Sequence, residues 1–292
     1  MDPMKQRPID ILSNDNTLFC TGQCNNRCIM CCQPPTNVDD INSLYDENIE
    51  RIYNAPKDLS IIGITGGEPT LLGGRLVDLI KVISEQLPNA NIHILSNGRE
   101  FKNNNLVEQL MAIAGEKIVF GIPLHSDNKI DHDIIAGAKG AFEDTMSGLY
   151  NLASNNACIE LRIVMNRLNY KRFYNISEFI YKNVPFVAWI AFMGMEYTGY
   201  AVKHNKNIWI EPNQYVIELY KAIKFLSGWN YDVCIYNIPL CLLPSDLHEF
   251  AEQSISDWKN DYQTFCTECL LKSKCCGSFT TSIKPYNGLH SI

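Results

Sequence analysis

Apolar runs alternate with amphipathic stretches over most of this chain, and this alternation constrains its fold more than any other feature. The apolar runs lie at 60–64, 91–95, 117–122, 158–165 and 186–192. Amphipathic stretches with apolar residues at i, i+3 and i+4 lie at about 44–54, 75–87, 105–114, 141–154 and 172–182. With a short apolar run at 17–20, this makes six β/α units. Strands that are apolar on both faces and alternate with helices indicate a parallel sheet.

Length, charge and cysteine content limit the classes of function. At 292 residues the chain can form one large domain and a small one. Its net charge of −7 argues against nucleic acid as a partner, since phosphate binding depends largely on Lys and Arg. We expect no membrane span and a cytoplasmic location, because the sequence shows neither an 18-residue apolar run nor a signal peptide. In that reducing compartment, twelve cysteines favour metal ligation over disulfides.

Three cysteines follow the first apolar run in a C-x₃-C-x₂-C row, Cys24, Cys28 and Cys31. Iron–sulfur clusters are usually held by four thiolates, so three from one loop leave an iron open to chelate a small molecule. A zinc knuckle with a distant fourth ligand is the alternative. We interpret Cys20 as a core residue and Cys32 as a thiol that lies near the ligands without binding metal.

The second long apolar run ends in Gly66, Gly67, Glu68 and Pro69. Two glycines at the end of a strand leave its backbone open to close approach. The carboxylate of Glu68 is suited to a ligand ammonium. Taken alone, the same four residues also fit an ordinary turn, because Gly and Pro are common in turns.

In this order and at this separation, the cysteine row and the Gly-Gly-Glu-Pro turn resemble the radical S-adenosylmethionine (radical SAM) superfamily. The resemblance implies an α/β fold in which the sheet curls into a partial (β/α)₆ TIM-like barrel, with both motifs at the carboxyl ends of strands. It implies that Cys24, Cys28 and Cys31 hold three irons of a [4Fe–4S] cluster and that the open iron takes S-adenosylmethionine. Gly66, Gly67 and Glu68 would then meet the methionyl ammonium.

Further contacts to S-adenosylmethionine are expected near the ends of the strands, at Pro69, Ser96, Asn97, Ser126, Arg162, Asn166 and Met195. Ser96 and Asn97 end the third strand, as a Thr-Asn-Gly turn does in many relatives, and we expect them to face the ribose, although a plain turn is the alternative. Peptide-modifying relatives carry Ser-Leu-Asp-Gly after the fourth strand; here Pro123 takes the serine position, so His125 or Ser126 would replace that contact. For Arg162 an internal salt bridge, and for Met195 a place in the core, remain open.

A second set of cysteines lies near the end of the chain. Its spacing, C-x₂-C-x₅-C, matches the closing part of the SPASM and twitch extensions of radical SAM enzymes, which carry auxiliary iron–sulfur clusters. We predict one auxiliary [4Fe–4S] cluster held by Cys241, Cys266, Cys269 and Cys275. Zinc with the same four ligands is the alternative. We exclude Cys234 because it lies in a strand-like run, and Cys276 because it adjoins Cys275.

The expected domains are an N-terminal segment at 1–16, the barrel over 17–205 and a cluster-binding extension over 206–292. The stretch 200–209 is polar, a helix pattern follows at 213–226, and 231–236 has the pattern of a short strand in the extension. No internal repeat or low-complexity segment occurs.

Longer sequence segments point to one particular group within the superfamily. They lie at 25–35, 191–201, 236–244 and 254–260, and they look like the smaller radical SAM maturase of the His-Xaa-Ser peptide system. This resemblance, over about 17–279, implies that the substrate is a ribosomally made precursor peptide that receives a crosslink or another post-translational modification. The expected partners are that peptide, companion maturation proteins and a reductant such as flavodoxin or ferredoxin. Because fewer than 20 residues precede the first strand, we expect substrate presentation without an N-terminal leader-binding domain.

Two other functions are weighed against this one. A nucleotide cyclase with a twitch cluster would need several Arg and Lys residues at the strand ends, and the sequence offers few beyond Arg99 and Arg162. A cluster-bearing scaffold without turnover is disfavoured by the intact Cys24, Cys28, Cys31 and Glu68.

Overall fold

The structure is a computed structural model that describes residues 6–13, 15–254 and 256–292. Its contacts divide the chain into two compact units. Unit 1 comprises Met1–Arg27, Gln33–Pro123 and Gly140–Glu160, and unit 2 comprises Cys28–Cys32, Leu124–Lys139 and Leu161–Ile292.

Parallel strands form the centre of unit 1. They are β1 (Thr17–Phe19), β2 (Ile61–Thr65), β3 (Asn91–Leu95) and β4 (Ile118–Pro123), followed by the first residues of β5 (Cys158–Val164). The register sets Thr17 opposite Gly63 and Ile92 opposite both Ile62 and Ile118. Consecutive strands of the chain are therefore neighbours, as in a sheet built from repeated β/α units.

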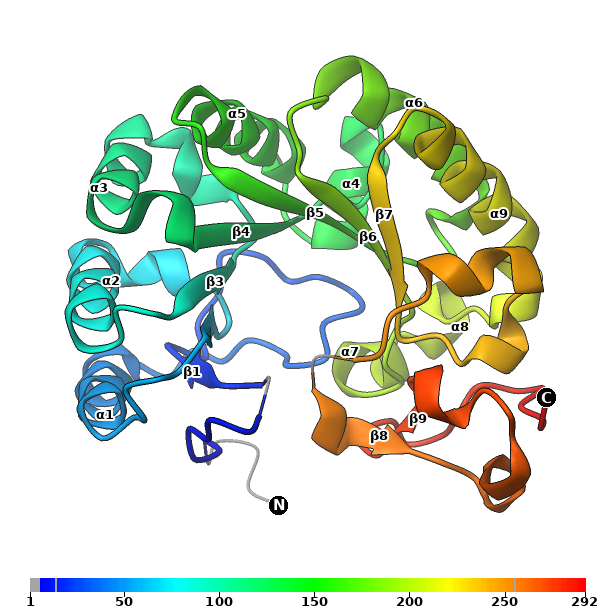
Figure 1. Cartoon of the computed structure of the whole chain (residues 1–292). Coiled ribbons are helices and arrows are strands. Elements are labelled where there is room, and N and C mark those ends of the chain that lie inside the picture. The colour runs from blue at the N-terminus through cyan, green and yellow to red at the C-terminus, as the bar shows by residue number, and fades with distance from the viewer. Residues whose placement is uncertain (1–5, 14, 255) are drawn as a thin grey trace. The chain divides into compact units, whose positions relative to one another are not determined.

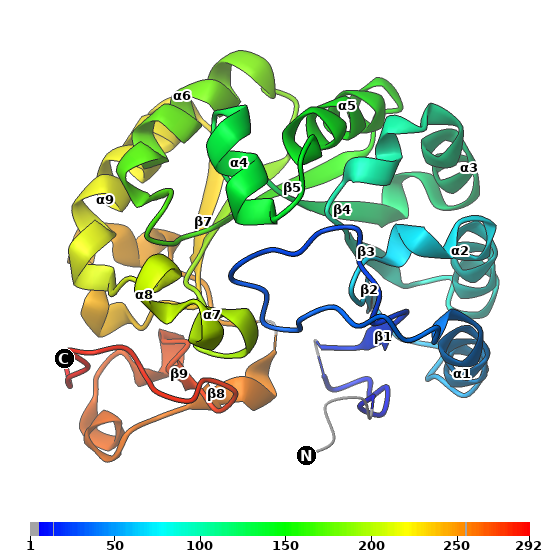
Figure 2. The same cartoon turned by 180° about the vertical axis from the view of Figure 1, so that it is seen from behind.

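Helices α1 (Ile41–Tyr53), α2 (Gly74–Gln86), α3 (Asn104–Ala114) and α5 (Ala141–Ser154) cover one side of these strands, as Figures 1 and 2 show. Helix α2 illustrates the cause, because Leu76, Leu79, Ile80 and Ile83 recur at helical spacing and are all buried. Ile62 and Ile92 in the sheet are buried as well, and the burial of each such side chain contributes about 1.5–3 kcal/mol to stability.

Unit 2 continues the parallel pairing. The last residues of β5, then β6 (Trp189–Met193) and β7 (Asp232–Tyr236), belong to it, with Trp189 opposite Asp232 and Met193 opposite Tyr236. Along the whole chain the strand order is β1 through β7. Helices α6 (Phe173–Asn183) and α9 (Pro212–Gly228) pack together through ring contacts such as Tyr174 with Phe225, whose centroids are 5.2 Å apart.

Short elements make up the rest of unit 2. Helices α4 (Lys129–Ala136), α7 (Gly199–Lys203) and α8 (Asn205–Ile208) precede α9, and an antiparallel pair, β8 (Asn260–Asp261) with β9 (Ser278–Phe279), lies near the end of the chain. Two 3₁₀ turns lie between these strands, η8 (Thr264–Glu268), which contains Cys266, and η9 (Lys272–Lys274), which directly precedes Cys275. None of the helices within the described ranges is long and apolar enough to span a membrane.

The expected α/β fold with a parallel sheet is confirmed, and the predicted strands and helices occur within a few residues of their expected bounds. Three features were not predicted. Helix α4 follows Asn128, whose side chain accepts the N–H of Asp131 at 2.9 Å as an N-cap. The polar stretch 200–209 forms α7 and α8 because Ala201 and Ile208 are buried. Strand β7, which the sequence placed in the extension, pairs with β6.

Candidate functional site

The cysteine loop begins in unit 1, where β1 ends. Cys20 is fully buried, and this burial raises the pKa of its thiol to about 12, as suits the predicted core residue. Asp40, at the start of α1, then fixes the next two residues. Its carboxylate accepts the hydroxyl of Thr21 at 2.6 Å and the backbone N–H of Gly22 at 2.8 Å. Asp40 was not predicted from the sequence, where its only signal is its position before a helical pattern.

The Gly-Gly-Glu turn lies directly against this loop. The N–H of Gly67 donates to the carbonyl of Thr21 at 2.6 Å, and the N–H of Glu68 donates to the carbonyl of Gln23 at 2.7 Å. A Cβ atom on Gly67 would overlap the Gln23 carbonyl oxygen and lie 2.6 Å from its carbon. The glycine is therefore required for backbone-to-backbone contact, a reason that the sequence did not reveal.

The carboxylate of Glu68 is buried and accepts four hydrogen bonds. Its Oε1 accepts the N–H and hydroxyl of Thr70, at 3.0 and 2.6 Å, and the hydroxyl of Ser96 at 2.7 Å; its Oε2 accepts the N–H of Asn97 at 2.7 Å. Burial raises the pKa of Glu68, and these hydrogen bonds partly offset that rise. Glu68 thus joins the end of β2 to the end of β3. Its predicted contact with an ammonium stays a prediction, as does the buried Pro69 beside it.

Ser96 and Asn97 are placed by the same network. Ser96 accepts the N–H of Gly98 at 3.0 Å while it donates to Glu68. The side-chain amide of Asn97 donates to the Asn25 side chain at 2.6 Å and to the sulfur of Cys24 at 3.9 Å. The structure therefore joins this turn to the cysteine loop, whereas its predicted contact with a ribose stays a prediction.

The segment Cys28–Cys32 belongs to unit 2, where two elements fix its backbone. The N–H of Ile29 donates to the carbonyl of Ile135 at the end of α4 at 3.0 Å, and the N–H of Tyr200 donates to the carbonyl of Cys31 at 2.9 Å. Gly199 has a positive φ of 54°, and a Cβ there would lie 2.5 Å from the Cys31 carbonyl oxygen. Only glycine fits this position without strain.

Four other residues that the sequence proposed as cofactor contacts lie in unit 2. Ser126 is buried and accepts the side chain of Asn128 at 3.2 Å. Asn166 is buried, and its side chain bonds to the backbone of Val164 and Leu168. The guanidinium of Arg162 lies 3.1 Å from the sulfur of Met193. Met195 packs in an apolar cluster with Met30 and Trp209. Their roles toward a cofactor stay predictions.

Two further groups of polar residues were missed by the sequence analysis. In unit 1, His93 on β3 and Glu160 on β5 meet at 2.7 Å, and Gly121 on the strand between them leaves the space that this pair occupies. In unit 2, the rings of His125 and His132 lie 5.0 Å apart and are both buried. Burial, followed by the neighbouring His132, holds the pKa of His125 well below its usual value. Only spatial proximity identifies either pair.

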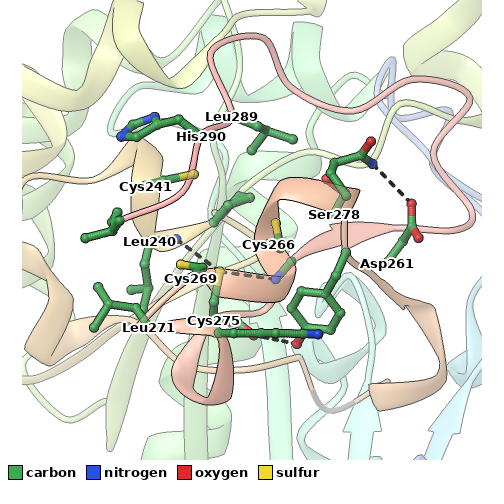
Figure 3. A pocket seen from close by; sticks show the side chains of 16 residues that line it. Leu240, Cys241, Asp261, Cys266, Cys269, Leu271, Cys275, Ser278, Leu289 and His290 are labelled. Carbon is green, nitrogen blue, oxygen red and sulfur yellow. Dashed lines mark hydrogen bonds between the residues drawn. The ribbon is translucent and has the colours of Figure 1, made fainter.

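The late cysteines meet in one cavity of unit 2. Cys241, Cys266, Cys269 and Cys275 all line it, together with apolar side chains such as Leu240, Leu271 and Leu289, as Figure 3 shows. Cys241 lies in the 3₁₀ turn η5 (Leu240–Leu242), Cys266 in η8, and Cys269 and Cys275 follow η8 and η9. Four thiols in an apolar cavity are the donor set that a [4Fe–4S] cluster requires, so the residues present fit the predicted auxiliary cluster.

Backbone N–H groups point at one of these sulfurs. The N–H groups of Leu240 and Gly277 both donate to the sulfur of Cys275 at 3.4 Å. The pKa of Cys275 falls to about 6, mainly because the thiol of Cys276 hydrogen-bonds to it. Among the described residues that line the cavity, neither Cys276 nor Cys234 is present. In the described parts of the chain, no group of three or more His, Cys, Asp or Glu residues is arranged around a single metal ion.

Comparison with protein families gives one match. The family model described as the Radical SAM superfamily matches residues 18–180, more than half of the chain. No curated protein matches the sequence.

Solved structures with a similar fold include SuiB, anSMEcpe and HemN. SuiB from Streptococcus suis bound to S-adenosylmethionine has a TM-score of 0.61 and 15% identity over 78% of this chain and 51% of that one. The protein anSMEcpe with bound AdoMet and the Cp18Cys peptide has a TM-score of 0.56 and 15% identity over 73% and 60%. Coproporphyrinogen III oxidase (HemN) from Escherichia coli has a TM-score of 0.55 and 15% identity over 76% and 53%. This chain thus matches about half to three-fifths of their lengths, and the likeness concerns the fold.

Proposed function

The chain belongs to the radical SAM superfamily, and on that premise we propose that it modifies a ribosomally made precursor peptide of the His-Xaa-Ser type. Enzymes of this family use a [4Fe–4S] cluster and S-adenosylmethionine. When bound, these cofactors supply a 5′-deoxyadenosyl radical by one-electron cleavage of S-adenosylmethionine, and the radical abstracts a hydrogen atom from the substrate.

One observation carries the proposal: the backbone of the Gly-Gly-Glu turn is hydrogen-bonded to the start of the cysteine loop. The bonds from Gly67 to Thr21 and from Glu68 to Gln23 hold the turn beside Cys24. A loop of ligands and a turn suited to an amino-acid ligand are thereby kept in a fixed relation, as positioning of two reactants requires. In our proposal Cys24, Cys28 and Cys31 bind the cluster.

The assigned roles of other residues follow from their chemistry. Gly66, Gly67 and Glu68 would receive the methionyl ammonium, since a carboxylate and bare backbone carbonyls accept N–H donors. Further contacts of the cofactor are proposed for Pro69, Ser96, Asn97, Ser126, Arg162, Asn166 and Met195. The Glu68 carboxylate already accepts four hydrogen bonds, so the backbone carbonyls of the turn are the more accessible acceptors for the methionyl ammonium.

The pairing of Arg99 favours a peptide over a nucleotide substrate. Arg99 is one of two arginines that the sequence offered to a phosphate, but its guanidinium forms an ion pair with Asp144 at 2.9 Å. A carboxylate that already neutralises the guanidinium weakens its attraction for an added phosphate. The similar fold of anSMEcpe, which was solved with a bound peptide, is compatible with the same substrate class.

We further propose that Cys241, Cys266, Cys269 and Cys275 bind one auxiliary [4Fe–4S] cluster. Their shared apolar cavity and the N–H donors on Cys275 support this ligand set. The one-electron cleavage of S-adenosylmethionine requires a source of electrons. A small reductant such as flavodoxin or ferredoxin, the precursor peptide and companion maturation proteins are the partners we infer.

Anaerobic reconstitution and co-expression test the proposed function. Purified protein should bind iron and labile sulfide, and with a reductant it should convert S-adenosylmethionine to 5′-deoxyadenosine. Co-expression with a His-Xaa-Ser precursor peptide should change the mass of that peptide. Colourless protein that binds zinc, or iron-loaded protein that yields no 5′-deoxyadenosine, would refute the proposal.

Matched cysteine variants make the test specific. Cys28→Ala should abolish 5′-deoxyadenosine formation, whereas Cys234→Ala should retain it, because Cys234 lies on β7 with its thiol directed at the carbonyl of Ile190. A mass change on added nucleotides but none on the peptide would favour the nucleotide cyclase instead.

A further inference from the structure

Arg99 holds two structural elements of unit 1 with one side chain. It is the first residue of the 3₁₀ turn η2 (Arg99–Lys102), just after β3. Its Nη1 donates to the backbone carbonyl of Asn25 at 2.8 Å and to the side-chain oxygen of Asn26 at 3.0 Å. Its Nε and Nη2 donate to the carboxylate of Asp144 at 3.2 and 2.9 Å. The planar guanidinium thus connects helix α5 to the two residues that follow Cys24.

The anchor on α5 is firm and charged. Asp144 lies in the first turn of α5, where a carboxylate is stabilised by the helix dipole, and it also accepts Lys102 Nζ at 3.0 Å. Only 15% of the Arg99 side chain and 23% of the Asp144 side chain are exposed, so solvent competes weakly for the pair. Arg99 is therefore anchored to α5 through the carboxylate of Asp144.

The residues that Arg99 grips deliver hydrogen-bond donors to Cys24. The backbone N–H of Asn26 donates to the Cys24 sulfur at 3.3 Å, and the amide of Asn97 donates to it at the longer distance of 3.9 Å. Asn97 is oriented in turn, because its side-chain oxygen accepts the backbone N–H of Arg99 at 3.0 Å. Both donors to the sulfur therefore depend on Arg99, one through its side chain and one through its backbone.

We propose that Arg99 is a positioning residue that clamps the Cys24 end of the cysteine loop and thereby sets the reduction potential of the cluster bound there. The inference rests on the proposed function, in which Cys24 is a ligand. Hydrogen bonds to cysteine sulfur stabilise the extra electron of a reduced cluster and so raise its potential. Without the clamp, Asn25 and Asn26 move more freely, the N–H of Asn26 leaves the Cys24 sulfur, and the cluster becomes harder to reduce.

The first experiment uses the metal-free protein and needs no turnover. We would compare Arg99→Gln with Lys102→Gln, which removes the same charge beside Asp144 but leaves the cysteine loop untouched. Alkylation with iodoacetamide, at a pH at which the Cys24 thiol is largely ionised in every variant, followed by peptide mass spectrometry, measures the exposure of that thiol rather than its ionisation. We expect the rate at Cys24 to rise about tenfold in Arg99→Gln and to stay within twofold of wild type in Lys102→Gln. Equal rates at Cys24 in the two variants would overturn the proposal.

The second experiment measures the potential of the reconstituted cluster. A redox titration would follow the EPR signal that changes when S-adenosylmethionine is added, which separates this cluster from the auxiliary one. At a fixed reductant poise, Arg99→Gln should lower the ratio of reduced to oxidised cluster about tenfold, equivalent to about 59 mV for one electron. Arg99→Lys should also lower this ratio, since a lysine keeps the positive charge but lacks the planar guanidinium that donates to Asp144, Asn25 and Asn26 at once. A wild-type potential in Arg99→Lys would assign the effect to charge and refute the clamp.

Two controls keep the outcomes distinct. If Arg99→Gln does not fold, as judged by circular dichroism, Asp144→Asn replaces it, and a smaller shift of the same sign is expected because an amide still accepts one hydrogen bond. An unchanged potential in Asp144→Asn would then count against the proposal. A wild-type protein that forms no S-adenosylmethionine-responsive cluster refutes the proposed function, whereas an active wild type with unaltered variants refutes only the role of Arg99.

Discussion

Replacing Gly67 with alanine tests whether the turn and the cysteine loop form one structural unit. The new Cβ would overlap the carbonyl oxygen of Gln23, lie 2.6 Å from its carbon and 2.9 Å from the carbonyl oxygen of Gly22. All three are backbone atoms, so no side-chain rotation relieves the clash. The two elements must separate, and the hydrogen bonds of 2.6 and 2.7 Å that join them weaken.

The magnitude follows from these two losses. Overpacking a close contact costs about 1–3 kcal/mol, and two backbone hydrogen bonds contribute about 1 kcal/mol each. The sum, about 3–5 kcal/mol, is a large part of a typical folding free energy, yet it leaves many domains folded. We therefore expect the melting temperature of the metal-free protein to fall by about 10 °C.

Thermal unfolding and iron analysis form the assay. Gly74→Ala is the matched control, because a Cβ at Gly74 meets no atom within 4 Å and the residue begins α2. The control should melt at or slightly above the wild-type temperature, since alanine favours a helix over glycine. Iron bound per chain should fall in Gly67→Ala and stay normal in Gly74→Ala. A Gly67→Ala protein that melts and binds iron like the wild type would show that our reading of this contact is wrong.

Three further outcomes are expected. Gly199→Ala should lower iron binding, because the new Cβ would lie 2.5 Å from the carbonyl oxygen of Cys31 and 2.7 Å from that of Cys32. Iron bound per chain at the wild-type level would contradict this expectation. Burial raises the pKa of Asp144, but hydrogen bonds from Lys102 and Arg99 lower it by more, so the pKa in the folded protein lies below its usual value. The stabilising effect of the carboxylate is therefore complete above the unfolded pKa, near 4, and is lost as the pH falls below that value. Urea titrations should show that the difference in stability between wild type and Asp144→Asn disappears below about pH 4, and a constant difference would argue against the ion pair. In metal-free protein at pH 8, iodoacetamide should label the exposed Cys32 but not the buried Cys20, whose thiol has a pKa of about 12, and labelling of both at similar rates would refute that assignment.

Much of the fold could be predicted because its signals are local. Leu76, Leu79, Ile80 and Ile83 mark one face of α2 in the sequence, and the same residues are buried in the structure. Helix α4 escaped prediction although Asn128 and Gly137 carry the cap signals, because only eight residues separate them. Strands β6 and β7 were both recognised as strands, but their pairing was not, since a pairing between residues 43 positions apart, such as Trp189 and Asp232, leaves no local pattern.

The candidate site divides in the same way. The spacing of the first cysteines and the Gly-Gly-Glu-Pro turn can be recognised from the order of residues, and so can the second set of cysteines near the end of the chain. The cavity that gathers Cys241 with Cys266, Cys269 and Cys275 depends on the folded path of a 35-residue segment. Likewise, Asp40, Asp144 and the pair of His93 with Glu160 have no motif, because each acts through a partner distant in sequence.

The sequence alone determined which cysteines are candidate ligands, their spacing and the alternation that produces a parallel sheet, because these depend on residue chemistry and short-range periodicity. Only the tertiary structure decided how the candidate site is held. It placed the backbone of Gly67 against Gln23 and the guanidinium of Arg99 between Asp144 and Asn25. Such contacts form when strand ends meet at one edge of a sheet, so they are fixed by packing over long chain separations rather than by any pattern within one segment.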